Sequence, residues 1–352
     1  MAEPGRRDTH LLQAGLGLLI LCALCPVVAF SAIYSLPSSG TDVVGEVKYV
    51  EARQADTLLD IARRFDVGYE EIRLANPGVD PWLPGEGTRV QIPTLFVLPD
   101  APRKGIVINL AEKRLYYYPP LHDSSDQERQ VFTHPISIGR EGWETPLGTT
   151  RIVRKDTDPV WTPPKSIRKE HAEKGDPLPD RILPGPDNPL GKYALRLGFS
   201  GYLIHGTNKP FGIGMEVSHG CIRMAPEDIE LLFDIISVGT VVRIVNQPFK
   251  AGWRDDMLYL EVHPKFVRIG DHKPVKWLDL SQMVETLVKV SGPERDNVEV
   301  DWDKANQIAK AATGIPTVTG SRPHEQDRSE TAARHIPPED RKYELLPEWA
   351  PH

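Results

Sequence analysis

The sequence predicts an α+β protein in which strands outnumber helices, and two observations carry this prediction. The 352 residues include 33 prolines, which favour loops and argue against an all-helical fold. Between residues 104 and 246, short apolar runs are separated by turn residues such as Gly, Pro and Asn, a pattern typical of strands. Apolar residues at helical spacing occur in only a few short segments. The length allows two or three domains.

The first 32 residues have the pattern of an export signal. Arg6 and Arg7 begin it, an apolar run extends over 14–30, and small residues follow up to Ala32. This pattern predicts a signal peptide over residues 1–32. Because the apolar run is nearly long enough to span a bilayer, an uncleaved membrane anchor is the alternative.

Residues 45–94 predict a small βααβ module. The expected elements are a strand over 47–50, a helix over 58–65 with Asp56 or Thr57 as its N-cap, a second short helix around 72–74, and a closing strand over 90–92. The Asn76-Pro77-Gly78 run ends the second helix, and a Pro-Gly pair at 84–85 turns the chain back.

This segment resembles a LysM module. The resemblance is carried by Ala55-Asp56-Thr57-Leu58, Ile61-Ala62, Phe65, Ile72, Asn76-Pro77, Leu83-Pro84-Gly85 and Val90-Gln91-Ile92-Pro93. Ala55 stands where the family usually has glycine. LysM modules bind N-acetylglucosamine polymers, so the resemblance implies glycan contacts at Asp56, Thr57, Asn76 and Pro77. A domain that only packs against its neighbour is the alternative.

The central region, residues 104–246, is expected to hold most of the strands. These are predicted at 106–110, 115–118, 131–138, 193–197, 202–204 and 241–245, with one clear helix that begins at Pro226. Residues 157–189 are dense in proline and charge, which indicates a long ordered loop. We call these residues the lid segment, because loops of this length often cover active sites.

The C-terminal part divides into two regions. Residues 256–313 are expected to form a small accessory domain, with a strand at 258–262 and a helix within 280–290. Residues 314–352 are polar, charged and rich in proline, which predicts a largely disordered tail.

Cysteine usage points to one functional thiol. Cys22 and Cys25 lie in the predicted signal, so the mature chain would keep Cys221 alone, which cannot form an internal disulfide. A thiol needs a base to become a nucleophilic thiolate, and imidazole titrates in the right range. His205 and His219 are the candidates. The backbone amides of Gly220 and Cys221 are candidate donors to an oxyanion. A partial zinc site and a buried inert cysteine are the alternatives.

These residues resemble the signature of the L,D-transpeptidase catalytic domain, also called the YkuD domain. The resemblance rests on His205-Gly206-Thr207 and Ser218-His219-Gly220-Cys221-Ile222-Arg223, with further agreement at Ile138-Gly139, Thr145-Pro146-Leu147-Gly148, Pro159 to Pro164 and Gly185 to Gly191. It spans about residues 40 to 312 and is closest to the periplasmic branch that attaches the Braun lipoprotein to the wall. The implied fold is a YkuD-type β-sandwich.

By matching position, the resemblance implies Cys221 as nucleophile and His205 as general base, with the Gly206 carbonyl holding its ring. His219 would orient the site or assist the oxyanion region. Arg223 stands where many members have asparagine, and it could pair with a substrate carboxylate or form a structural salt bridge. Further candidates for substrate contact are Ser218, Trp161, Tyr193 and Phe211. No metal or organic cofactor is implied.

The implied reaction transfers an acyl group from a peptidoglycan stem peptide to an amine in the Gram-negative periplasm. The expected acceptor is the C-terminal lysine of an outer-membrane lipoprotein. The alternatives are 3-3 crosslinking of stems, hydrolysis by an L,D-carboxypeptidase or a lipoprotein-releasing amidase, and a non-catalytic wall-binding protein. The formal net charge of -7 gives no support to nucleic-acid binding.

Overall fold

The computed structural model describes residues 32–36, 40–120, 129–267, 275–292 and 298–322. The predicted signal peptide lies outside the described residues except for Ala32, and so do residues 323–352 of the predicted tail. None of the described helices is long and apolar enough to cross a membrane.

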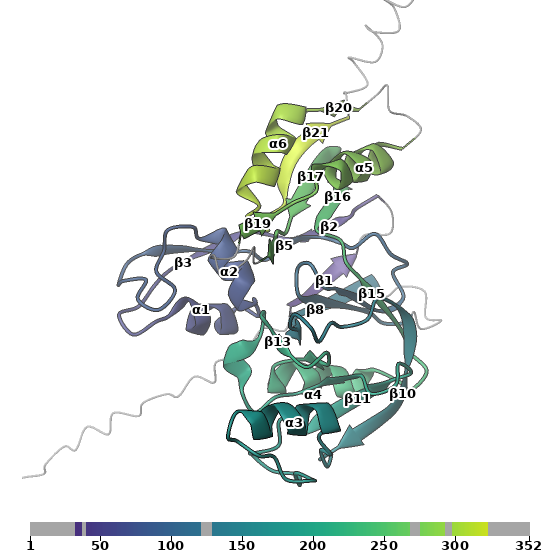
Figure 1. Cartoon of the computed structure of the whole chain (residues 1–352). Coiled ribbons are helices and arrows are strands. Elements are labelled where there is room, and N and C mark those ends of the chain that lie inside the picture. The colour runs from purple at the N-terminus through teal and green to yellow at the C-terminus, as the bar shows by residue number, and fades with distance from the viewer. Residues whose placement is uncertain (1–31, 37–39, 121–128, 268–274, 293–297, 323–352) are drawn as a thin grey trace, which may run out of the picture.

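Figure 1 shows an N-terminal module (residues 45–94) and a C-terminal unit (residues 249–322) packed on a central domain (residues 104–246). The N-terminal module has the expected βααβ order, with its elements at β3 (Lys48–Glu51), α1 (Leu58–Arg64), α2 (Tyr69–Ala75) and β4 (Arg89–Ile92). Strands β3 and β4 pair antiparallel. Thr57 is the N-cap of α1 and forms a capping box with Asp60.

The segment between the predicted signal and the module is more ordered than the sequence suggests. Its Pro- and Ser-rich composition predicts a loop over 35–45, but β1 (Ala32–Leu36) pairs with β8 of the central domain. Strand β2 (Val43–Gly45) pairs with β5 (Leu95–Val97). A strand as short as β2 has too few residues to show alternation in sequence.

The central domain is built on a nine-stranded sheet of order β1-β8-β7-β6-β15-β10-β11-β12-β14. Its remaining strands are β6 (Gly105–Asn109), β7 (Arg114–Tyr118), β8 (Arg129–Pro135), β10 (Gly148–Thr157), β11 (Tyr193–Leu197), β12 (Leu203–His205), β14 (Ile222–Arg223) and β15 (Val241–Val245). A separate pair is formed by β9 (Ile138–Gly139) and β13 (Glu216–Ser218).

Strand β10 joins two halves of this sheet. It pairs with β15 along its first part and with β11 along its second, with an irregularity between Ile152 and Arg154. Buried side chains from both halves, such as Ile108 and Leu195, belong to one apolar core, which α4 (Pro226–Ile235) also covers. The packing is the expected YkuD-type mixed fold, with strands in the majority.

The lid segment connects β10 to β11 and contains a helix that the sequence does not predict. This helix, α3 (Lys165–Glu173), buries only Ile167. Because it has no apolar stripe, hydrophobic periodicity could not indicate it. The segment is anchored at its base, where Asn188 Nδ2 donates to the Pro159 carbonyl at 2.7 Å and Trp161 pairs with Ile182.

The C-terminal unit is larger than the expected 256–313. It begins with β16 (Phe249–Arg254) and ends with β21 (Thr317–Ser321), and its other elements are β17 (Met257–Val262), β18 (Lys265–Val267), β19 (Val275–Trp277), α5 (Leu280–Ser291), β20 (Glu299–Val300) and α6 (Trp302–Ala311). Strand β21 lies in the predicted disordered tail. Its polar sequence does not indicate a strand. It is ordered because it pairs with both β17 and β20.

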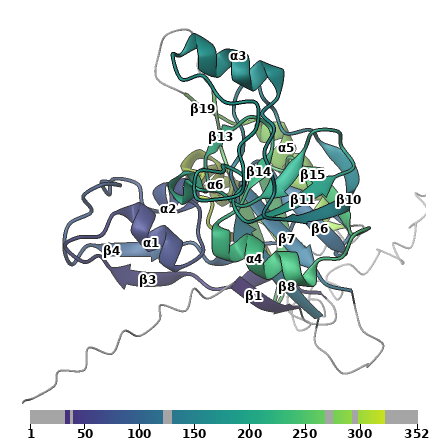
Figure 2. The same cartoon turned by 90° about the horizontal axis from the view of Figure 1, so that it is seen from below.

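Buried ion pairs join the N-terminal module to the central domain, and Figure 2 shows α1 and α2 beside this junction. Arg114 of β7 binds Glu71 of α2. Lys113 Nζ lies 2.8 Å from Glu70 of α2 and 3.2 Å from Glu216 of β13. The backbone N–H of Tyr69 also donates to the Ile213 carbonyl at 3.2 Å. The module therefore contacts the chain directly before β13, which leads to Cys221.

Candidate active site

Cys221, His205 and Arg223 are brought together by two parallel strands. In the β12–β14 pair, Ile204 is the register partner of Ile222, and His205 is the partner of Arg223. Ile204 and Ile222 are both fully buried in the core. Since side chains alternate along a strand, His205 and Arg223 project from the opposite face. Cys221 directly precedes Ile222, and the charge of Arg223 acts on its thiol.

His205 is held in its neutral form. Its ring is buried, and Nδ1 lies 2.6 Å from the Gly206 carbonyl oxygen. A carbonyl only accepts, so Nδ1 carries the proton and Nε2 is left with its lone pair. Burial, followed by the positive charge of Arg223, lowers the pKa of His205 to about 4. The imidazole is therefore uncharged at neutral pH.

The thiol of Cys221 is also uncharged at neutral pH. It is partly exposed, and Sγ lies 3.6 Å from the Gly201 carbonyl oxygen. Burial raises the pKa of Cys221 above its ordinary value, while a backbone hydrogen bond from Leu203 and the charge of Arg223 act in the opposite direction. A thiol with a raised pKa is protonated at neutral pH.

Arg223 has no salt bridge within the described part of the chain. Its Nε is buried without a hydrogen-bond partner there. Burial lowers its pKa, yet the guanidinium stays charged at any physiological pH. The structural salt bridge considered as an alternative is therefore not found. An unpaired cation beside the thiol is suited to bind an anionic group.

Ser218, Gly220 and Cys221 form a tight turn, residues 218–221, that we call the cysteine turn. Ser218 Oγ donates to the Cys221 carbonyl at 2.5 Å and accepts from the Gly220 N–H at 3.1 Å. Ser218 is buried and serves the turn, which corrects its expected place among substrate contacts. The Gly220 N–H is likewise engaged, so it is not a free oxyanion donor. Glycine is needed at residue 220 because the φ angle of Gly220 is +100°.

Comparison with known proteins identifies the fold around this turn. Residues 103–244 match the YkuD family, the L,D-transpeptidase catalytic domain. The chain is 40% identical over 311 residues to the probable L,D-transpeptidase ErfK/SrfK of Escherichia coli strain K12, covering 86% of this chain and 96% of that protein. It is 41% identical over 295 residues to the probable L,D-transpeptidase YbiS of the same strain, covering 82% and 92%. The chain belongs to the L,D-transpeptidase family. The predicted family and enzyme class are thereby confirmed.

A loop over residues 139–145 supports the cysteine turn of this L,D-transpeptidase from one side. The Arg140 N–H donates to the Ser218 carbonyl at 3.1 Å. Thr145 Oγ1 donates to the Gly220 carbonyl at 2.8 Å and accepts from the Gly139 N–H at 3.0 Å. The sequence did not give these residues a role, although Gly139 and Thr145 lie in runs that resemble the family.

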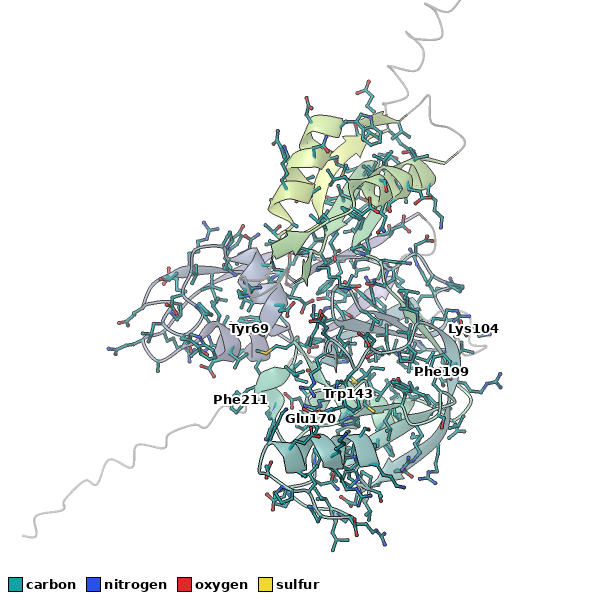
Figure 3. All side chains as sticks on the ribbon, viewed as in Figure 1. Tyr69, Lys104, Trp143, Glu170, Phe199 and Phe211 are labelled. Atoms are coloured by element: carbon teal, nitrogen blue, oxygen red, sulfur yellow. The ribbon has the colours of Figure 1, made fainter. Side chains whose placement is uncertain are left out.

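His219 is directed at the lid segment. Its Nε2 lies 3.0 Å from Glu170 Oε2 and 3.0 Å from Arg140 Nη2, and its ring meets Trp143 edge-on at 4.8 Å between centroids. Burial is the largest cause of its lowered pKa. These contacts suit the expected orienting role better than the expected role at the oxyanion. Figure 3 shows Trp143 and Glu170 in this region.

The three aromatic residues named as candidates for substrate contact lie in different parts of the structure. Tyr193 donates to Glu230 Oε1 at 2.9 Å and packs on Phe233, so it faces α4. Phe211 is 65% exposed and lines a pocket between the L,D-transpeptidase domain and the N-terminal module, together with Tyr69. Trp161 belongs to the base of the lid segment. The spacing of residues along the sequence does not predict the direction in which a side chain points near the end of a strand.

The residues expected to bind glycan have mostly structural contacts. Asp56 binds Arg64 at 2.8 Å, and Thr57 caps α1. Asn76 is buried: Nδ2 donates to the carbonyls of Ile72 and Gln91. Its direct contact with glycan is therefore a wrong expectation. Pro77 is exposed. Trp82 and Leu83, to which the sequence analysis assigned no glycan contact, are 59% and 78% exposed.

Proposed function

We propose that Cys221 is the nucleophile of this L,D-transpeptidase, that His205 is its general base, and that the donor is a peptidoglycan stem peptide. The observation that carries the proposal is the shared face of β12 and β14, on which His205 and Arg223 are register partners beside Cys221. The Nδ1 hydrogen bond to Gly206 supports it, because it leaves the other ring nitrogen free to accept a proton.

In the first half-reaction, the thiol proton of Cys221 passes to His205 Nε2 as Sγ attacks the carbonyl of the third stem residue, meso-diaminopimelate. The bond to D-Ala breaks, and its nitrogen takes the proton from the His205 imidazolium. A thioester on Cys221 remains. Because the pKa of His205 is lowered to about 4, its imidazolium is a strong acid and gives up this proton readily.

In the second half-reaction, an amine acceptor gives a proton to His205 and attacks the thioester carbonyl. The C–S bond breaks, and the sulfur of Cys221 takes the proton back. We propose Arg223 as the group that binds a substrate carboxylate, since its guanidinium has no salt bridge among the described residues. The Cys221 amide is the proposed oxyanion donor, since the Gly220 amide is engaged by Ser218.

The proposed acceptor is the C-terminal lysine of an outer-membrane lipoprotein, and the proposed location is the periplasm. The export pattern in residues 1–32 and the resemblance to the lipoprotein-attaching branch support both. A second stem peptide and water are the competing acceptors, since a fold does not determine the acceptor.

A wall-binding role for the N-terminal module is favoured by its exposed apolar side chains. Trp82 and Leu83 lie on the α2–β4 connection. The Leu58 N–H donates to the Pro81 carbonyl at 2.9 Å, which places this connection against the start of α1. Aromatic rings next to polar groups are suited to stack on sugar rings. We propose glycan binding at this surface.

Mass spectrometry tests the reaction. The protein is mixed with a diaminopimelate-containing tetrapeptide muropeptide, with and without a lysine-ending peptide. A muropeptide–peptide adduct with loss of D-Ala, together with a thioester on Cys221, supports lipoprotein attachment. Stem dimers favour crosslinking, and a tripeptide alone means that water is the acceptor. Turnover by the Cys221→Ala variant at the wild-type rate would overturn the nucleophile assignment.

A further inference from the structure

Among the described residues, the hydrogen bonds and ion pairs that tie helix α3 to residues outside the lid segment converge on one side chain, and the ring of His171 lies 6.4 Å from that of His219 between centroids. In the described residues, most side-chain hydrogen bonds and ion pairs of this helix stay within the lid segment, as between Arg168 and Asp180 and between Lys169 and Glu173. Only Ile167 is buried. Glu170 is the residue whose polar contacts reach outside the segment.

Glu170 meets two residues of the active-site framework. Its two carboxylate oxygens each lie 2.6 Å from Arg140 Nη2, and Oε2 lies 3.0 Å from His219 Nε2. Lys174 Nζ adds a contact at 2.5 Å from within the lid segment. Hydrogen bonds from Arg140, and then from Lys174, lower the pKa of Glu170 to about 2, so its carboxylate is charged at neutral pH.

Both partners of Glu170 are fixed to the cysteine turn. His219 is itself part of the turn, two residues before Cys221. The Arg140 N–H is hydrogen-bonded to the Ser218 carbonyl at 3.1 Å. Trp143 meets the His219 ring edge-on. A movement of α3 away from the domain must therefore break contacts that begin on the turn carrying the thiol.

We propose that Glu170 is a positioning residue that latches the lid helix α3 to the cysteine turn through Arg140 and His219. The proposal rests on the proposed role of Cys221 as nucleophile. With the latch formed, α3 is held beside the thiol, and the bound stem peptide is shielded from water. With the latch broken, the lid segment keeps its base at Asn188 and Trp161 but loses its contact with the turn.

The latch depends on a carboxylate at residue 170 rather than on side-chain volume. His219 Nε2 meets both Arg140 and Glu170, so it accepts from the guanidinium when unprotonated and donates to the carboxylate when protonated. In either state, Glu170 keeps its two short contacts with Arg140. A glutamine at residue 170 has the same shape but lacks the charge that makes these contacts strong.

The test compares Glu170→Gln with Glu173→Gln. Glu173 lies in the last turn of the same helix, and its contact with Lys169 is exposed and internal to α3, so Glu173→Gln is a matched control. The first measurement is the rate at which iodoacetamide alkylates Cys221, followed by mass spectrometry of the peptide. The second is tryptic cleavage after Lys165, Arg168, Lys169 or Lys174 in the intact protein.

We expect Glu170→Gln to be alkylated and cleaved faster than wild type, by on the order of tenfold, as the loss of a charge-assisted hydrogen-bond network permits. Glu173→Gln should match the wild type in both measurements. Arg140→Gln should reproduce the Glu170→Gln result, because it removes the other half of the latch. Thermal melting of each variant separates a loosened lid from a loss of fold.

Turnover gives an independent readout. A lid that closes on bound substrate contributes to binding, so Glu170→Gln should raise KM for the tetrapeptide muropeptide severalfold more than it lowers kcat. If Glu170→Gln and Glu173→Gln have equal alkylation rates, cleavage rates and KM values, the latch is excluded. The alkylation and cleavage measurements need no turnover, so a failed assignment of Cys221 as nucleophile would be seen separately, with the Cys221→Ala variant.

Discussion

Arg114 and Glu71 form a buried, two-point ion pair between the central domain and the N-terminal module. Arg114 Nε lies 2.7 Å from Glu71 Oε1, and Nη2 lies 3.0 Å from Oε2. The arginine side chain is fully buried, and 7% of the glutamate side chain is exposed. Because each charge is desolvated at the junction, each depends on the other part of the chain for its partner. The module is thus a structural part of this enzyme as well as a candidate wall-binding domain.

Breaking this pair should cost much of the stability. Glu71→Gln leaves the Arg114 guanidinium buried without its counter-charge, and we expect the free energy of unfolding to fall by roughly 3–5 kcal/mol. Urea titration measures this change in the free energy of unfolding. Glu227→Gln is the control, because the Arg63–Glu227 pair spans the same junction at 2.8 Å with 38% of each side chain exposed. That change should stay within about 1 kcal/mol. Similar losses in the two variants would contradict the argument.

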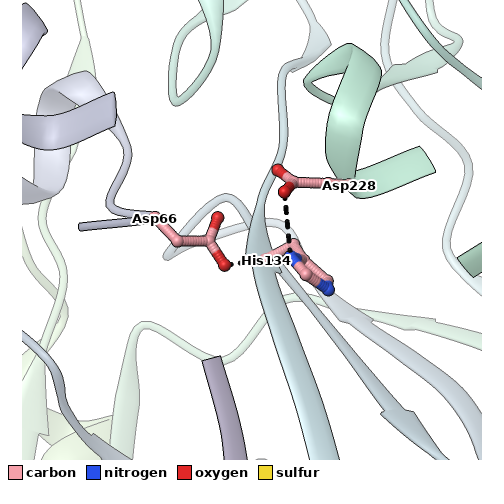
Figure 4. Close-up of side chains that lie close together, drawn as sticks. All are labelled: Asp66, His134 and Asp228. Carbon is pink, nitrogen blue, oxygen red and sulfur yellow. Dashed lines mark ion pairs between the residues drawn. The ribbon is translucent and has the colours of Figure 1, made fainter. Parts of the chain in front are cut away.

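His134 should make the stability depend on pH in the alkaline range. Figure 4 shows its ring between Asp66 of the module and Asp228 of α4, at 2.9 and 3.4 Å from Nδ1. Burial would lower the pKa of His134, but the two carboxylates outweigh it and raise the pKa to about 10. The folded protein therefore keeps this proton above pH ~6.5, where an unfolded chain loses it.

The stabilisation from His134 is complete below about pH 6.5 and is lost as the pH rises toward about 10, by up to ~1.4 kcal/mol per pH unit. We expect the urea-derived free energy of unfolding to fall over this range in the wild type, and to fall less steeply in His134→Gln. The difference between the two slopes isolates this group from others that titrate. Parallel slopes would show that His134 is neutral in the folded protein.

The sequence predicts an element of this fold where the pattern that indicates the element lies within the element itself. The apolar faces of α1 and α4 and the strands 106–110 and 115–118 were predicted, because each carries its own periodicity. The pairing of His205 with the Gly206 carbonyl was also accessible, since the resemblance implied it. Helix α3 and strand β21 were missed, because neither has an apolar pattern and both are held by distant partners.

The site residues follow the same rule. The resemblance to the family implied that His205, Cys221 and Arg223 belong to one site, and the register of β12 and β14 agrees. Spacing could not reveal that Tyr193 faces α4, or that His219 meets Glu170 from a helix roughly fifty positions earlier in the chain. Contacts of this kind depend on how the lid segment folds back, and no local pattern encodes that path.

Asn76 and Trp82 should separate stability from glycan binding in the N-terminal module. Asn76→Ala removes buried hydrogen bonds to the backbone of Ile72 and Gln91. Because these backbone groups are left unpaired, we expect the free energy of unfolding to fall by roughly 1–3 kcal/mol. Trp82→Ala removes an exposed ring and should leave the melting temperature unchanged while weakening pelleting with insoluble sacculi. If Trp82→Ala binds sacculi as the wild type does, the proposed glycan surface is wrong.

Arg223 should tune both reacting groups, and its replacement tests this through two titrations. Burial lowers the pKa of His205 and raises that of Cys221, and the charge of Arg223 lowers both. Arg223→Gln should therefore move the alkaline midpoint of iodoacetamide alkylation at Cys221 to higher pH, whereas Arg223→Lys, which keeps the charge, should move it less. Arg223→Gln should also raise KM for the muropeptide about tenfold or more, the scale of one lost hydrogen bond to a charged group. An unchanged midpoint in Arg223→Gln would mean that the guanidinium does not act on the thiol, and an unchanged KM would mean that it binds no substrate carboxylate.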